Sequence, residues 1–216
     1  MSYGLRAGIS FCAAGGRHFF LDRHANRYFA LKDKDEALFL QLLDSRIDPA
    51  HIRDISPALA RLLCARSNAP LTPFALPHAP RCEMDWQGGR ARPILVLRAI
   101  LTFILVKASL VRHAPARLFD ACARAKPRSF APRQPDAMLV ELGRAFERVR
   151  AWTGEDQCLP LSLSFAKLAY GMGYPVTIVL AISPRPFGAH CWVQLGSKVV
   201  NDHLGRVETF TPIYAI

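Results

Sequence analysis

Several signatures of metal, nucleotide and export chemistry are missing from this sequence. Its six cysteines form no CxxC pair and no spacing typical of a zinc site. It contains no GxGxxG or P-loop motif for a nucleotide. The opening MSYGLRAGISFCAAGG lacks the charged and then apolar segments of a signal peptide. We therefore expect no metal and no evident cofactor, with nucleotide dependence left open, in a cytoplasmic protein whose thiols are reduced.

Long runs free of charge are also lacking. The most apolar segment, PILVLRAILTFILVKASLVR (93–112), is interrupted by Arg98 and Lys107, which argues against a transmembrane helix. Its polar residues Arg98, Thr102, Ser109 and Arg112 follow one helical stripe. The segment therefore predicts a buried core helix with a narrow polar face. A membrane-surface or partner-binding helix is the alternative.

Positive charge is abundant and unevenly spread over the 216 residues. The net charge of +11 divides into +3 (10 basic, 7 acidic) in 1–80, +8 (14 and 6) in 81–150 and zero (4 and 4) in 151–216. A basic middle is compatible with nucleic acid, a lipid surface or an acidic protein partner. The simpler interpretation is a solvated, Arg-rich helical surface.

The first 68 residues predict a small module of strands followed by helices. Short apolar runs at 9–12, 18–21 and 28–31 are separated by turn-forming residues, as in two hairpins. Leu38, Phe39, Leu42 and Leu43 then follow a helical period. Pro49 and Pro57 each suit the first turn of a further short helix, the last spanning about 57–66. This order suggests a winged-helix-like module.

Proline marks the next boundary. The segment APLTPFALPHAPRC contains four prolines, which favours a linker, and we assign 69–92 to it. The remainder, 93–216, predicts a helical region followed by a mixed core. A basic, Pro-rich loop at 123–135 precedes a helix at about 136–151.

A candidate nucleophile lies where a loop enters a helix. In GEDQCLPLSLSFAKLAYGMGY (154–174), Pro160 suits a first helical turn, while Gly171 and Gly173 end the helix. Cys158 is therefore expected at the helix N-terminus. The unpaired N–H groups and the dipole there favour a thiolate and could stabilise an oxyanion. One oxyanion donor would be the Cys158 amide; Gln157 and Trp152 are weak candidates for the second.

Two further residues complete a possible triad. Residues 175–183 predict a strand, and His190–Leu195 with Lys198–Asp202 predict a hairpin. A thiolate needs an imidazole, and the imidazole needs a carboxylate to fix its tautomer. Each of Cys158, His190 and Asp202 is individually ordinary as a core, strand or turn residue. Their joint order favours catalysis.

Strand register adds a constraint on this triad. With a two-residue Gly-Ser loop, residue 190 would pair with 203, so His190 and Asp202 would point to opposite faces. We therefore expect a three-residue loop or a bulge. Alternatively, Asp202 lies beyond the regular pairing and bends back.

The sequence at this point resembles the lasso-peptide maturation proteases, B proteins with a transglutaminase-like cysteine-protease fold. The resemblance rests on Cys158-Leu159, VTIVLAIS, His190-Cys191-Trp192-Val193 and Asn201-Asp202 in the last third, and on FFLDRHANRYFAL (19–31) in the leader-recognition part. The family often has a basic residue shortly after Cys-Leu and Glu after Trp-Val, where this chain has Pro160-Leu161 and Gln194.

The resemblance implies an α+β chain with a specific reaction. A winged-helix-like leader-recognition module would precede a transglutaminase-like or papain-like domain with an antiparallel sheet. The protein would bind the leader of a ribosomal precursor peptide and cleave between leader and core. Cleavage would free the core amine for a separate cyclase resembling asparagine synthetase. Cys158 would attack, His190 would transfer the proton and Asp202 would orient His190.

Leader capture is expected to occur by strand addition to the first module. The last strand offers Tyr28, Phe29, Ala30 and Leu31 at an edge that could be open, and a groove toward Leu59 and Leu62 would read apolar leader side chains. The alternative is that both edges are covered within the fold.

Three other functions use the same features differently. A peptide-binding adaptor would carry the triad without using it, and a transglutaminase-like acyltransferase would pass the acyl group to an amine. A winged-helix nucleic-acid binder would use PALARLLCARS (57–67), which carries Arg61 and Arg66 but no dense basic face. We therefore expect no nucleic-acid partner.

Overall fold

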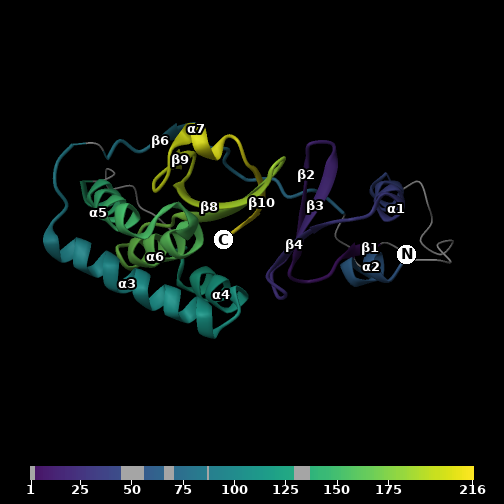
Figure 1. Ribbon diagram of the computed structural model, residues 1–216, viewed down its shortest axis with the longest axis horizontal. Coiled ribbons are helices and arrows are strands. Elements are labelled where there is room, and N and C mark those ends of the chain that lie inside the picture. The colour runs from purple at the N-terminus through teal and green to yellow at the C-terminus, as the bar shows by residue number, and fades with distance from the viewer. Residues whose placement is uncertain (1–2, 45–55, 66–70, 87, 129–136) are drawn as a thin grey trace. The chain divides into compact units, whose positions relative to one another are not determined.

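The computed structural model describes residues 3–44, 56–65, 71–86, 88–128 and 137–216. The chain divides into two compact units, Met1–Ala75 and Leu76–Ile216 (Figure 1). The boundary falls inside the Pro-rich stretch assigned to a linker (69–92), but part of that stretch is structured. Residues 82–83 form a strand of the second unit, so the linker assignment is too long.

The N-terminal unit contains a three-stranded antiparallel sheet in the order β2 (Ile9–Ala14), β3 (Arg17–Asp22), β4 (Arg27–Ala30). The three predicted strands and both hairpins are confirmed. Gly15 and Gly16 both have positive φ, 56° and 80°, as a tight two-residue hairpin turn requires. Among the described strands, β4 pairs with β3 alone.

Two helices and a second small sheet complete this unit. Helix α1 (Asp33–Leu43) follows β4, and α2 (Pro57–Leu62) begins with the Ser56 hydroxyl accepting a hydrogen bond from the Leu59 amide. The predicted helix 57–66 is shorter than expected, because the chain turns at Leu63 into β5 (Leu63–Ala65), which pairs with β1 (Tyr3–Leu5). The helix predicted from Pro49 lies outside the described residues.

Aromatic packing joins these elements into one core. Phe11 and Phe20 stack at 5.7 Å between ring centroids, and the ring of Phe39 meets both edge-on at 5.2 and 5.1 Å. Such edge-to-face pairs add to the free energy of burial. Glu36 of α1 accepts a 2.8 Å hydrogen bond from the His18 amide, which ties the helix to β3.

The second unit is built on a five-stranded sheet in the order β10-β7-β8-β9-β6. Its strands are β6 (Cys82–Glu83), β7 (Thr177–Pro184), β8 (Phe187–Leu195), β9 (Lys198–Val199) and β10 (Thr211–Ala215). Pairing is antiparallel as expected, except between β6 and β9, which run parallel. The sheet is therefore not purely antiparallel.

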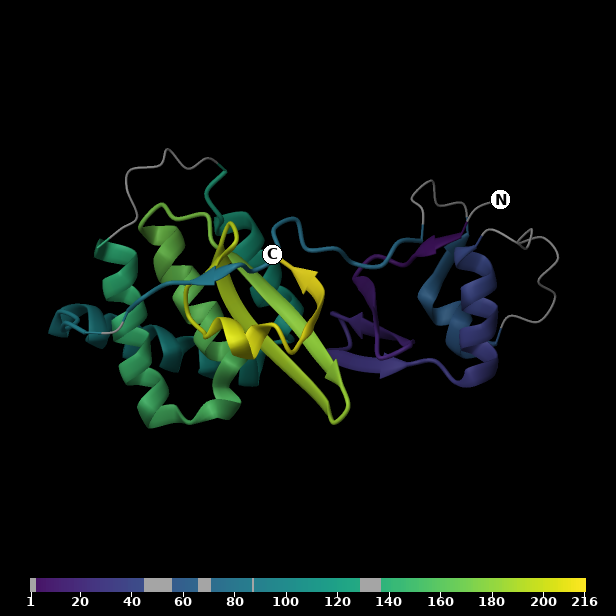
Figure 2. The same ribbon diagram turned by 90° about the horizontal axis from the view of Figure 1, so that it is seen from above.

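Helix α6 (Cys158–Gly171) is the centre of this unit. It packs on β7 and β8, and α3 (Pro93–Arg112), α4 (Pro115–Ala125) and α5 (Ala137–Thr153) contact it (Figures 1 and 2). Ten of its residues are buried, so it lacks the usual solvent-facing stripe. The short element η2 (Glu155–Gln157) directly precedes Cys158, and α7 (Leu204–Val207) begins two residues after Asp202.

Helix α3 has the predicted bounds but not the predicted environment. Only Leu95, Ala99, Phe103 and Val106 are buried, so the prediction of a buried core helix is wrong. By length and composition α3 is apolar enough to cross a membrane, and 22% of its most apolar window is buried. One such helix is weak evidence for a span, because core helices pass the same test.

Candidate active site

Cys158 is the first residue of α6, as its sequence context predicts. The one-turn η2 delivers the chain to this point, and no side chain caps the start of α6. The first N–H groups of a helix have no partner within it, so the thiol of Cys158 lies at a positively polarised helix end. Its side chain is half-buried, which leaves it accessible to a substrate.

His190 reaches Cys158 from the middle of β8. The residue pairs with Ala181 of β7 and its side chain is only 4% exposed. The Phe210 ring lies 4.9 Å from the imidazole centroid and restricts its rotation. Its Nε2 lies 2.7 Å from Oδ2 of Asp202, and its ring hydrogen-bonds the Cys158 thiol. Because Nε2 faces Asp202, Nδ1 remains for the thiol.

Asp202 reaches His190 from outside the regular hairpin. The β8–β9 loop has two residues, since Leu195 pairs with Lys198 and Gln194 with Val199. The expected three-residue loop or bulge is therefore wrong. The alternative holds: β9 ends at Val199, and Asp202 lies in the chain that bends back beyond it.

Asn201 makes this bend possible. Its side-chain Oδ1 accepts a 2.6 Å hydrogen bond from the Val193 amide, taking a position on β8 that a strand carbonyl would otherwise occupy. Its Nδ2 donates to Ser162 Oγ at 3.0 Å, and that hydroxyl donates to the Cys191 carbonyl at 3.0 Å. All these groups are buried, so the network fixes Asp202 relative to both α6 and β8.

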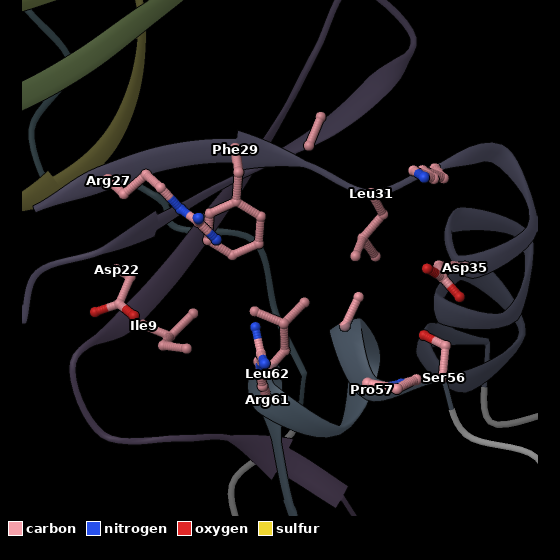
Figure 3. Close-up of a pocket in the computed structure, with 13 residues that line it drawn as sticks. Ile9, Asp22, Arg27, Phe29, Leu31, Asp35, Ser56, Pro57, Arg61 and Leu62 are labelled. Carbon is pink, nitrogen blue, oxygen red and sulfur yellow. The ribbon is translucent and has the colours of Figure 1, made fainter. Parts of the chain in front are cut away.

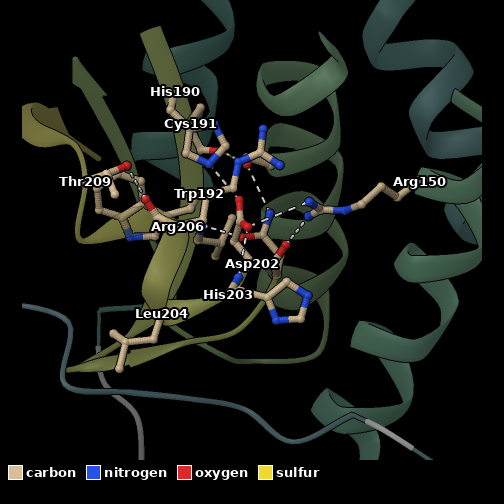
Figure 4. Close-up of polar contacts among 12 residues, drawn as sticks. Arg150, His190, Cys191, Trp192, Asp202, His203, Leu204, Arg206 and Thr209 are labelled. Carbon is tan, nitrogen blue, oxygen red and sulfur yellow. Dashed lines mark hydrogen bonds and ion pairs between the residues drawn. The ribbon is translucent and has the colours of Figure 1, made fainter. Parts of the chain in front are cut away.

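The second oxygen of Asp202 is also held (Figure 4). Its Oδ1 accepts a 2.8 Å hydrogen bond from the His203 amide and lies 3.8 Å from Nη1 of Arg150. Arg150 comes from α5 and also donates through Nη2 to the Asn201 carbonyl. Asp202 is 2% exposed, and a buried carboxylate of this kind requires such partners.

The pKa shifts of His190 and Asp202 follow from these contacts. Burial lowers the pKa of His190, but the hydrogen bonds to Asp202 and Cys158 raise it, and the net pKa lies above the usual value. Burial raises the pKa of Asp202, whereas the His190 hydrogen bond and the Arg150 charge lower it, and the net pKa falls. The site therefore favours an imidazolium beside a carboxylate.

Several residues that support the candidate site are not among those that the sequence predicts. Ser162 carries a usable signal, because it is a polar residue four positions after Cys158 in an apolar helix and so lies on the same helix face. Arg150 and Phe210 gave no local signal, because their partners lie far along the chain. Gln194 is 1% exposed and donates to the carbonyls of His78 and Gly196 at 2.7 Å, so it holds the Pro-rich segment on the sheet.

Cys191 lies beside His190 in sequence but is no alternative nucleophile. It is buried, and burial raises its thiol pKa well above the usual value. Among the described residues, no group of three or more His, Cys, Asp and Glu side chains is arranged to hold a metal ion.

The residues predicted to bind a leader lie in the N-terminal unit, and a cavity of about 690 Å³ collects most of them (Figure 3). Phe29, Ala30, Leu31 and Leu62 line it. Tyr28 and Leu59 do not. Leu59 is fully buried in the core, so it supports the cavity wall rather than facing the cavity, which corrects its predicted role.

The elevated pKa of His190 predicts a pH-dependent stability. Because the folded pKa lies above the unfolded value of about 6.5, this group's stabilisation is complete below that pH and is lost as the pH rises through the folded pKa. The free-energy advantage of the wild type over His190→Gln should therefore shrink as the pH rises above about 6.5. Urea unfolding followed by tryptophan fluorescence measures it, since all three tryptophans lie in the second unit. A constant or growing advantage would contradict the assignment.

A comparison with known protein families assigns the segment that contains these three residues to a superfamily. The model of the transglutaminase-like superfamily matches residues 101–215, which is more than half of the chain and includes Cys158, His190 and Asp202. No curated protein and no solved structure matches the chain. The matched segment runs from α3 to β10 and so contains the helix start, the strand and the bend described above. The chain belongs to the transglutaminase-like superfamily.

Proposed function

We propose that this protein is the leader peptidase of a lasso-peptide pathway and that Cys158, His190 and Asp202 form its catalytic triad. Membership of the transglutaminase-like superfamily indicates a cysteine-protease or acyltransferase type of activity. The observation that carries the proposal is the buried 2.7 Å contact between His190 and Asp202, with the imidazole also hydrogen-bonded to the Cys158 thiol. A nucleophile and a base within hydrogen-bond reach, with the base oriented by a third group, is the arrangement that nucleophilic catalysis requires.

The reaction follows from the positions of these atoms. His190 takes the proton of Cys158, and Sγ attacks the scissile carbonyl carbon to form a tetrahedral oxyanion. The amide of Cys158, at the helix start, is one donor toward that oxygen; Gln157, directly before it, is a candidate for the other. His190 then protonates the leaving amine. Water, deprotonated by His190, hydrolyses the thioester and releases the leader's new carboxylate.

The N-terminal unit supplies the substrate-binding part of the proposal. We infer that residues 1–68 are a winged-helix-like leader-recognition module. Strand β4 pairs on one side with β3 and, among the described strands, with no other, and its residues Phe29, Ala30 and Leu31 line the cavity beside α2. An extended leader could add to this edge and place apolar side chains in the cavity.

Cleavage leaves a core peptide with a free α-amine, and that amine is the nucleophile a ring closure needs. A cyclase resembling asparagine synthetase is therefore the proposed partner that consumes the product. The step described here needs no cofactor and no nucleotide, since hydrolysis of an amide through a thioester is favourable by itself.

Product analysis tests the proposal directly. The reading frames beside its gene are searched for a short precursor peptide, which is incubated with the purified protein, and the products are identified by mass spectrometry. We expect one cut between leader and core, with a free carboxylate on the leader. A leader joined to an added amine would instead show an acyltransferase. Leader binding without any covalent change would show an adaptor.

Two substitutions on α2 test whether the cavity binds the leader. Ala58 and Ala60 are both exposed on α2, but only Ala58 lines the cavity. A tyrosine at Ala58 should fill part of the space and weaken leader binding by about tenfold or more, whereas Ala60→Tyr should leave it unchanged. Fluorescence anisotropy with a labelled leader peptide measures both. Equal effects of the two variants would exclude this cavity as the leader site.

A further inference from the structure

Helix α3 carries an apolar seam on the side away from its own domain. Ile94, Leu97, Leu101, Ile104, Ala108 and Val111 follow a spacing of three and four residues, which is the heptad spacing of helix pairing. The five large members are between 50 and 84% exposed. At 100° per residue, this seam lies opposite the buried stripe from Leu95 to Val106. Figure 1 shows α3 running along the outside of α5 and α6.

Positive charge flanks the seam. Arg98, Lys107 and Arg112 are the only charged residues of α3, and all three are exposed next to it. No carboxylate of the described residues forms an ion pair with any of them. They occupy the positions that, in a pair of helices, face the flanking positions of the partner helix. The seam therefore consists of apolar side chains, and all the charged residues beside it are positive.

This charge pattern decides between a second copy and another protein. If two copies of α3 paired, parallel or antiparallel, basic flanking residues would meet basic flanking residues, which disfavours the pair. A partner helix with acidic flanking residues would neutralise them. The zero net charge of 151–216 and the +3 of 1–80 show that the excess charge is concentrated in the part of the chain that contains α3.

A cavity beside the seam provides a place for an anchoring side chain. It measures about 230 Å³ and lies between α3, α4 and α6. Leu105 and Ser109 of α3 form one wall, and Leu118, Cys122 and Leu163 contribute to the others. Leu105 is 61% exposed, so the cavity opens next to the seam. Interfaces gain much of their affinity from a bulky side chain in such a pocket.

We propose that α3 is a docking surface for another protein, which presents an amphipathic helix with acidic residues beside its apolar stripe. The helix would lie along the seam from Ile94 to Val111 and place one bulky apolar side chain in the cavity at Leu105. This surface is separate from the triad, so its test does not depend on the proposed peptidase activity.

The test uses the full chain and two designed peptides. Both peptides have Ile and Leu at the apolar heptad positions; one has Glu and the other Lys at the flanking positions. We expect the Glu peptide to bind at least about tenfold more tightly by fluorescence anisotropy and to gain helical circular dichroism on binding. Exchanging Arg98, Lys107 and Arg112 for Glu should reverse this preference.

Matched variants locate the binding. Leu101→Gln with Ile104→Gln should abolish binding of the Glu peptide, whereas Leu40→Gln, an exposed leucine of α1, should not affect it. Trp192, fully buried in the second unit, reports by its fluorescence that the seam variant is folded, and circular dichroism reports the same for Leu40→Gln. The proposal is overturned if neither peptide binds, or if the seam variant binds like the wild type. It is also overturned if the chain binds phosphatidylcholine–phosphatidylglycerol vesicles through the seam in preference to the peptide, or self-associates through it in sedimentation.

Discussion

Replacing Cys158 with Ala should reduce precursor cleavage by roughly 10⁴-fold or more, because the attacking atom is removed. Leader binding should be unchanged, since the proposed binding cavity lies wholly in the N-terminal unit. Single-turnover cleavage followed by mass spectrometry measures the first effect, and anisotropy with labelled leader measures the second. The fluorescence of the tryptophans, all of which lie in the second unit with Cys158, shows whether that unit of the variant is folded.

Cys82 provides the matched control for this variant. It is an exposed cysteine of the same unit, outside the triad, and Cys82→Ala should cleave at the wild-type rate. A thiol-directed alkylating probe should inactivate the wild type and the Cys82→Ala variant alike. Substantial turnover by purified Cys158→Ala would remove Cys158 from the mechanism.

Asp202→Asn should lower the cleavage rate by about 10³- to 10⁴-fold, because an amide cannot stabilise the imidazolium and permits the wrong tautomer of His190. The fold should persist, since the amide keeps the size of the carboxylate and its Oδ1 can still accept from the His203 amide. His190→Ala should be at least as damaging. Rates are compared at saturating precursor, so that binding does not contribute.

An exposed aspartate of α4 is the control for the loss of one negative charge. Asp120→Asn should leave the rate unchanged, because Asp120 is exposed and lies on another element. If Asp202→Asn cleaved at nearly the wild-type rate while His190→Ala did not, the site would be a Cys-His dyad. The 2.7 Å contact would then serve stability alone.

Local patterns were sufficient to predict the elements that bear the triad. The start of α6 at Cys158 follows from the proline and the polar loop before it, and the hairpins of β2, β3 and β4 follow from glycine and polar turns between apolar runs. These signals act over a few residues, so a single sequence contains them. The position of His190 within β8 follows from the same alternation.

Long-range pairings could not be predicted in this way. Strands β6 and β10 are short and depend on partners far along the chain. The place of Asp202 depends on the Asn201 side chain replacing a strand hydrogen bond, which no periodicity reveals. The environment of α3 does not follow from its sequence, because a helix that is apolar on nearly all sides does not indicate which side is covered.

The pairing of β6 with β9 has a consequence for how the molecule is made. The N-terminal unit closes its sheets with residues between Tyr3 and Ala65, so it can fold while the ribosome is still adding the rest. The second sheet joins Cys82 to Lys198 and Thr211 to Ile182, so it cannot close until the segment that forms β10 has emerged. Each newly synthesised molecule therefore passes through an interval in which its first unit is folded and Cys158, His190 and Asp202 are not yet brought together.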